Sequence, residues 1–105
     1  MDKKRKEGTM EITEVRIHLR SEEKLKAYAA VTFDKCFVVR DMKVINGNTG
    51  MFVAMPSRKK PDGTFKDIAH PLDNDTRQKL ESKILSAYQE EINKTKYQIP
   101  LAKES

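Results

Sequence analysis

Three consecutive cations are the residues best suited to chemistry with an anionic ligand. Arg58, Lys59 and Lys60 directly precede a Pro-Asp-Gly sequence, which is typical of a tight turn. A hairpin tip at this point could bring all three side chains to phosphate oxygens without desolvating a core. The residue types leave two interpretations open, a phosphate-binding loop and a solvated charged loop.

A second group of cations lies further along the chain, in a segment with a helical pattern. Arg77, Lys79 and Lys83 fall on the predicted outer face of that helix. Because Glu81 lies among them, these cations would either face a nucleic-acid groove or form ion pairs along the helix. Tyr28 falls on the more polar face of a predicted strand, where its ring could stack on a base.

The sequence contains no constellation typical of catalysis or metal binding. Cys36, the single cysteine, has no evident histidine base and is expected to be a small buried hydrophobic residue. His18 and His70 bring no further ligands near them. The glycines of residues 46–50 lack the spacing of a phosphate-binding loop. We therefore predict that the protein is not an enzyme and uses no metal or cofactor.

Composition indicates one soluble domain with an excess of positive charge. The 105 residues are 37% hydrophobic and 35% charged, and the net charge of +5 favours polyanionic partners. A lone cysteine excludes an intramolecular disulfide and favours a reducing compartment. No apolar run approaches the roughly 20 residues that cross a bilayer. These features predict a cytoplasmic protein that does not bind membranes.

Two hydrophobic periods predict an α+β fold. Apolar and polar residues alternate with the period of strands, and beyond Pro71 apolar residues recur at the three- and four-residue steps of a helix. We expect a twisted antiparallel β-sheet of about five strands with a C-terminal α-helix packed on it. The predicted strands are residues 13–20, 25–33, 36–45, 51–55 and 65–69.

The same patterns predict the core and the limits of the domain. Phe33, Phe52 and Tyr88 are expected in the core, and Asp73, Asn74 and Asp75 are competing helix caps. The basic residues 1–9 have nothing apolar to bury, so we predict a disordered N-terminal tail. The domain is expected to span residues 10–92, and residues 93–105 to form a flexible C-terminal tail.

Several segments resemble the SpoVG family of bacterial septation and regulatory proteins. GMFVAMPSRKKPDG and FKDIAHP have the family's order and spacing, and EITEVRIHL at the front fits as well. The resemblance covers about residues 10–90. It implies a small α+β homodimer that takes part in septation, sporulation and virulence-gene control and that binds DNA, with some members also binding RNA.

The resemblance also adds weight to particular residues. The family's basic pair after the AMPS motif falls on Arg58 and Lys59, and Lys60 stands where many relatives have threonine. The family's helix region is implicated in target choice, which points to Arg77, Gln78 and Lys79.

Two functions from different classes follow. The first is a dimeric, cytoplasmic regulator that contacts DNA, or alternatively RNA, through the nucleic-acid-binding residues Arg58, Lys59, Lys60, Arg77 and Lys79. The second is an adaptor that acts on the division machinery through protein contacts alone, by way of an exposed sheet edge.

Overall fold

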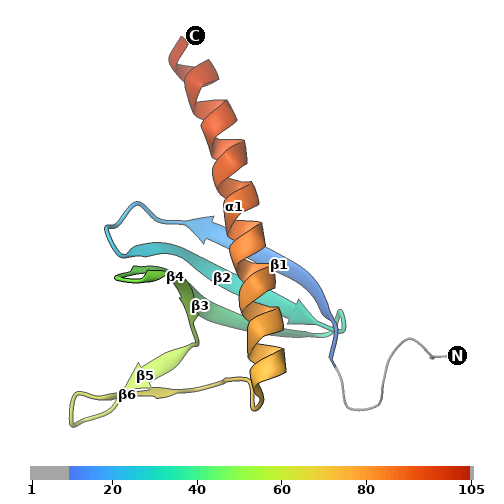
Figure 1. Cartoon of the computed structure of the whole chain (residues 1–105), viewed down its shortest axis with the longest axis vertical. Coiled ribbons are helices and arrows are strands. Elements are labelled where there is room, and N and C mark those ends of the chain that lie inside the picture. The colour runs from blue at the N-terminus through green and yellow to red at the C-terminus, as the bar shows by residue number, and fades with distance from the viewer. Residues whose placement is uncertain (1–9, 105) are drawn as a thin grey trace, which may run out of the picture.

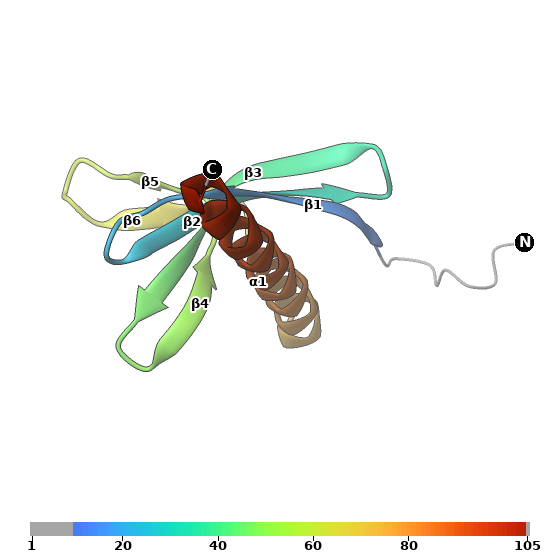
Figure 2. The same cartoon turned by 90° about the horizontal axis from the view of Figure 1, so that it is seen from above.

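Four strands form an antiparallel sheet in the order in which they occur along the chain. A computed structural model describes residues 10–104, with side chains described through residue 95, so the predicted tail at residues 1–9 lies outside the described residues. The strands are β1 (Ile12–Leu19), β2 (Leu25–Phe33), β3 (Phe37–Gly47) and β4 (Gly50–Ala54). Figure 2 shows the strong twist of this sheet, with β4 and the adjoining end of β3 turned away from the direction of β1.

A separate two-stranded ribbon follows the sheet. β5 (Ser57–Lys59) pairs with β6 (Phe65–Asp67), and together they project from the body of the molecule (Figure 1). No strand was predicted between residues 55 and 65, but residues 57–59 form one that pairs with residues 65–67. The α+β prediction is confirmed, with the strands divided between a four-stranded sheet and this small second sheet.

The helix α1 (Asn74–Glu104) packs against one face of the four-stranded sheet (Figure 1). Alternate residues of β2 point toward it, so Ala27, Ala29 and Val31 are almost completely buried. Leu80 and Ile84 supply the helix side of the core, as their spacing predicts. Each position of this core follows from a period of two in the sheet and steps of three or four in the helix.

Three predicted positions turn out differently. Phe52 is 44% exposed because its neighbour Val53 is the residue of β4 that points into the core. Cys36 is exposed because it lies in the turn between β2 and β3. Glu81 lies beside the sheet rather than on the outer helix face, and its carboxylate accepts a hydrogen bond of 3.1 Å from the amide of Val53.

Asp73 caps the start of α1, as one of the three predicted candidates. Its carboxylate accepts hydrogen bonds from the Thr76 amide at 2.9 Å and the Thr76 hydroxyl at 2.8 Å. These hydrogen bonds hold the pKa of the Asp73 carboxyl below its ordinary value, because they favour the charged form.

The helix continues to Glu104, well past the predicted domain limit at residue 92. Glu91 favours this continuation, since its carboxylate lies 3.7 Å from the Lys94 ammonium and its carbonyl accepts a hydrogen bond from the Thr95 hydroxyl. A helical backbone at residues 93–104 does not test flexibility, so the domain limit at residue 92 and the flexible tail at residues 93–105 stay predictions. Among the described residues, no helix combines the length and the apolar character needed to cross a membrane.

Ile84→Ala should lower the free energy of unfolding by about 2–5 kcal/mol, because its fully buried side chain would leave a cavity between helix and sheet. Urea denaturation followed by circular dichroism measures the change. Ile92→Ala is the matched control, since Ile92 is only half-buried and its truncation should cost less. Equal destabilisation in the two variants would contradict the packing described above.

Candidate nucleic-acid interface

The β5–β6 ribbon carries a cation on each of its two faces. In its register Arg58 lies opposite Lys66, and Lys59 lies opposite Phe65. Residues that pair directly in an antiparallel ladder share a face, so Arg58 and Lys66 point to one side and Lys59 to the other. Lys60 begins the turn at the tip. All of these side chains are exposed.

The pairing of Arg58 with Lys66 places two positive charges directly across a narrow ribbon. Such like-charge pairs destabilise a sheet unless an anion lies between or beside them. In the part of the chain that the structure describes, no carboxylate forms an ion pair with Arg58, Lys59, Lys60 or Lys66. The four ribbon cations are therefore available to an external anion.

The turn at the tip is closed by its own polar groups. The Lys60 amide donates to the Thr64 carbonyl at 2.7 Å, and the Gly63 amide donates to the Lys60 carbonyl at 2.9 Å. Gly63 has a φ of 91°, a conformation that glycine adopts without steric cost. The turn is thus a defined structure that fixes the position of Lys60.

Asp62 takes part in this turn. It accepts hydrogen bonds from the amide of Thr64 at 2.9 Å and from its hydroxyl at 2.7 Å. These bonds, the one from the hydroxyl first, lower the pKa of the Asp62 carboxyl. The turn thus holds Asp62 in its charged form, and among the described residues neither Asp62 nor Asp67 of β6 lies within ion-pair distance of a ribbon cation.

The base of the ribbon is anchored in the domain. Met55 and Pro56, the residues just before β5, are buried, and the Ile68 amide donates to the Pro56 carbonyl at 2.7 Å. The buried base fixes the position of the ribbon relative to the domain. The exposed cations are therefore held at a defined place, as contact with phosphates requires.

The helix cations lie on a different surface. Lys79 and Lys83 flank a shallow hollow beside Val15 of β1, whereas Arg77 is half-buried in the first turn of α1. Among the described residues, α1 contacts all four strands of the large sheet but neither strand of the ribbon. The structure therefore divides the five predicted site residues into two groups that are not adjacent.

The two histidines were not predicted to be metal ligands. His18 and His70 are both exposed. No group of three His, Cys, Asp or Glu side chains that could hold a metal ion occurs within the described residues.

Comparison with known proteins decides the family. The SpoVG family model matches residues 10–90, which is more than half of the chain. The chain belongs to the SpoVG family. A protein of Anaeromyxobacter sp. (strain K) is 62% identical over 85 residues, covering 81% of this chain and 84% of its own. One of Thermoanaerobacter sp. (strain X514) is 60% identical over 81 residues, covering 76% and 88%.

A third SpoVG relative, from Myxococcus xanthus (strain DK1622), is 55% identical over 84 residues, covering 80% of this chain and 85% of its own. All three carry the name "Putative septation protein SpoVG". The resemblance found in the sequence is confirmed, and the matched region includes the whole ribbon and the first half of α1. The SpoVG family is a family of septation regulators whose members are not known as enzymes.

Lys66 of this SpoVG chain was not among the predicted site residues. It was assigned to a predicted strand, but no partner strand was assigned to residues 57–59, so its position opposite Arg58 did not emerge. The signal was present in the Pro-Asp-Gly turn, because a hairpin folded about that turn brings the two flanking segments into register.

Lys66→Glu should stabilise the ribbon by roughly 0.2–1 kcal/mol, because it replaces a like-charge pair with an opposite-charge pair. Amide hydrogen exchange at Lys60 and Ile68, which donate at the tip and the base, should slow correspondingly. Lys24→Glu makes the same change of charge in the turn before β2 and should leave both amides unaffected. Faster exchange in Lys66→Glu would refute the repulsion argument.

Proposed function

We propose that this SpoVG protein is a nucleic-acid-binding regulator that contacts duplex DNA through the β5–β6 ribbon. The observation that carries the proposal is the pairing of Arg58 with Lys66, two exposed cations with no carboxylate ion-paired to them among the described residues. A phosphate backbone supplies the missing negative charge, and its oxygens accept the hydrogen bonds that both side chains donate.

The shape of the ribbon supports DNA as the ligand. A two-stranded β-ribbon fits the major groove of B-form DNA, whereas the major groove of A-form RNA is too deep and narrow for side chains to reach its bases. Arg58 and Lys66 on one face and Lys59 on the other would meet the phosphates of both groove walls. Such contacts position a protein on DNA without specifying a sequence.

The helix cations have a separate place in this proposal. Lys79 is exposed and lies on the β1 side of α1, away from the ribbon. Together with Arg77 it would contact a part of the nucleic acid that the ribbon of the same subunit does not touch. The proposal therefore assigns the main phosphate contacts to the ribbon and an additional contact to the helix.

We further propose that the protein acts as a homodimer. Leu72 is 92% exposed, and the preceding residue, Pro71, lines a hollow of ≈ 130 Å³ whose lining is almost entirely apolar and includes Phe37. Phe37 itself is 63% exposed. Apolar surface gathered in this way marks a protein interface, and a second copy would present both the protruding side chain and the hollow that receives it.

Sedimentation equilibrium should give the wild-type chain about twice its monomer mass of 12.1 kDa. Leu72→Glu should reduce the mass to that of one chain, because a carboxylate cannot be desolvated in an apolar hollow. Since the side chain is almost fully exposed in the monomer, the substitution should not unfold it. Thr49→Glu, in the turn between β3 and β4, is the matched control. A monomeric wild-type protein would exclude the dimer.

The double variant Arg58→Ala with Lys66→Ala should weaken binding to duplex DNA of any sequence. The slope of log K against log salt concentration should become shallower by about 0.9 for each phosphate that the variant no longer neutralises. Fluorescence anisotropy with a random-sequence duplex at several salt concentrations measures both effects.

Lys24→Ala with Lys35→Ala is the control for that experiment. It lowers the net charge by the same amount, from +5 to +3, by removing two exposed cations from turns of the large sheet. A control variant whose slope falls as much as that of the ribbon variant would show that binding depends on net charge and not on the ribbon. If the wild-type protein bound no nucleic acid even at low salt, the apolar hollow would favour the adaptor function instead.

A further inference from the structure

The face of the large sheet that α1 leaves uncovered has a hollow at its centre. The hollow measures ≈ 680 Å³, and its lining includes Tyr28, Ala30 and Thr32 from alternate positions of β2. These residues point away from the helix, because Ala27, Ala29 and Val31 between them are buried beneath it. The hollow thus lies on the side of the sheet that faces away from the helix and the core.

Tyr28 is the central residue of this face. In the sheet register its neighbours are His18 on β1 and Lys43 on β3. The Arg20 guanidinium lies 5.8 Å from the centre of the tyrosine ring. Ala30, two residues further along the same strand, also lines the hollow, and its small side chain leaves space beside the ring for a flat group.

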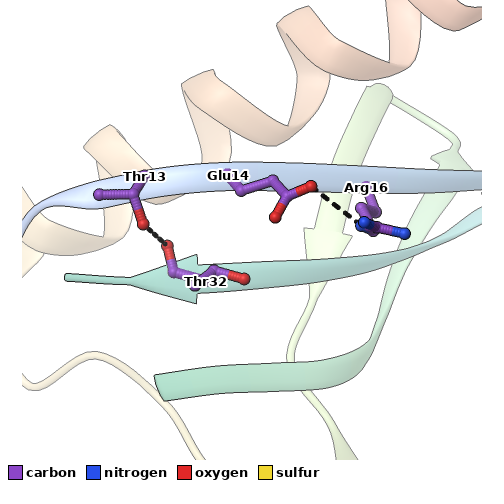
Figure 3. Close-up of polar contacts among 4 residues, drawn as sticks. All are labelled: Thr13, Glu14, Arg16 and Thr32. Carbon is purple, nitrogen blue, oxygen red and sulfur yellow. Dashed lines mark hydrogen bonds and ion pairs between the residues drawn. The ribbon is translucent and has the colours of Figure 1, made fainter. Parts of the chain in front are cut away.

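Cations surround the hollow, and some of them form ion pairs with neighbouring carboxylates. Arg16 pairs with Glu14 at 3.0 Å along β1 (Figure 3), and Arg20 pairs with Glu22 at 2.9 Å. Both pairs are solvent-exposed, and such pairs contribute little, so either arginine can exchange partners. Arg40 forms no ion pair with any described residue.

This face also carries acids, which limits what it can bind. Glu14 lies on it, and Asp41 lies at the edge of the hollow in a β3 bulge. The net positive charge is therefore smaller than on the ribbon, so charge alone would not hold a duplex here. Stacking must therefore supply the rest of the binding free energy. Only unpaired bases offer their flat faces to a side chain.

A second depression shares Tyr28 and Asp41 with the hollow. Its other lining residues are Lys43 of the sheet and Pro56, Ser57 and Ile68 at the base of the ribbon. A strand that leaves a duplex held by the ribbon would meet Lys43 first and then Tyr28. The two depressions thus place Lys43 and Tyr28 between the base of the ribbon and the hollow, with the acid Asp41 beside them.

We propose that this uncovered sheet face, with Tyr28 at its centre, is a binding site for a single-stranded segment of nucleic acid. Tyr28 and Arg20 stack with bases, and Arg16, Arg40 and Lys43 contact the backbone. The inference rests on the proposed function, which it deepens by adding a second form of the same ligand at a separate site.

Tyrosine substitutions test the site with an unstructured oligo(dT) strand as the probe. Tyr28→Leu should weaken binding of the strand by roughly 5- to 150-fold, the range that loss of one stacked base produces. Tyr28→Phe should retain most of the affinity, because the ring is what stacks. Neither variant should alter binding of a blunt duplex, which contacts the ribbon. Circular dichroism checks that both variants remain folded.

Fluorescence supplies a direct measurement of binding at the ring position. The chain contains no tryptophan, so Tyr28→Trp introduces a single indole at the centre of this face. Addition of oligo(dT) should quench its emission, and addition of blunt duplex should not. Quenching by both ligands, or by neither, would overturn the assignment of a single-strand site.

The outcomes separate the two proposals. If Arg58→Ala with Lys66→Ala abolishes duplex binding while Tyr28→Leu leaves strand binding unchanged, the ribbon function stands and the sheet site is wrong. If wild-type protein binds oligo(dT) in a Tyr28-dependent manner but shows no ribbon-dependent duplex binding, the sheet site stands and the ribbon function is wrong. Binding of neither ligand by wild-type protein refutes both.

Discussion

The fold depends on a single constraint, the register in which β2 pairs with its two neighbours. β2 lies between β1 and β3, so its alternation decides which side chains of all three strands face the helix. Ala27, Ala29 and Val31 fill the helix side. A slip of one residue would send Tyr28 into the core and expose the small apolar residues. Burial of one face therefore fixes the composition of the other.

The two faces differ in what they allow. The helix side requires small and β-branched residues in β2, because Leu80 and Ile84 fill the space above them. The uncovered side has no such requirement, and it carries an aromatic ring, arginines and carboxylates at half-exposed positions. The ribbon depends on the same core, since the buried residues Met55 and Pro56 connect the end of β4 to the start of β5.

Sequence could predict the elements with strong periodicity and could not predict those without it. The long strands β1 and β2 and the buried helix residues followed from their periods. The three-residue strands of the ribbon are too short to show a period, so Lys66 was missed. Phe52 was misplaced because residues 51–55 are all apolar, so their alternation does not show which face is buried, and Val53 rather than Phe52 faces the core. Cys36 was placed at the start of a predicted strand, but β3 begins one residue later, so Cys36 lies in the preceding turn and is exposed.

The cations of this SpoVG protein differ in whether a carboxylate lies close enough to form an ion pair. On the sheet face, Arg16 and Arg20 have carboxylates within ion-pair distance, so these two charges are partly balanced without a ligand. On the ribbon, Arg58 faces Lys66 and the acid at the tip is held by Thr64. Repulsion across two short strands can be tolerated only because the ribbon is closed at its tip and anchored at its base. The ribbon is thus the place where an external anion would relieve the most unfavourable charge.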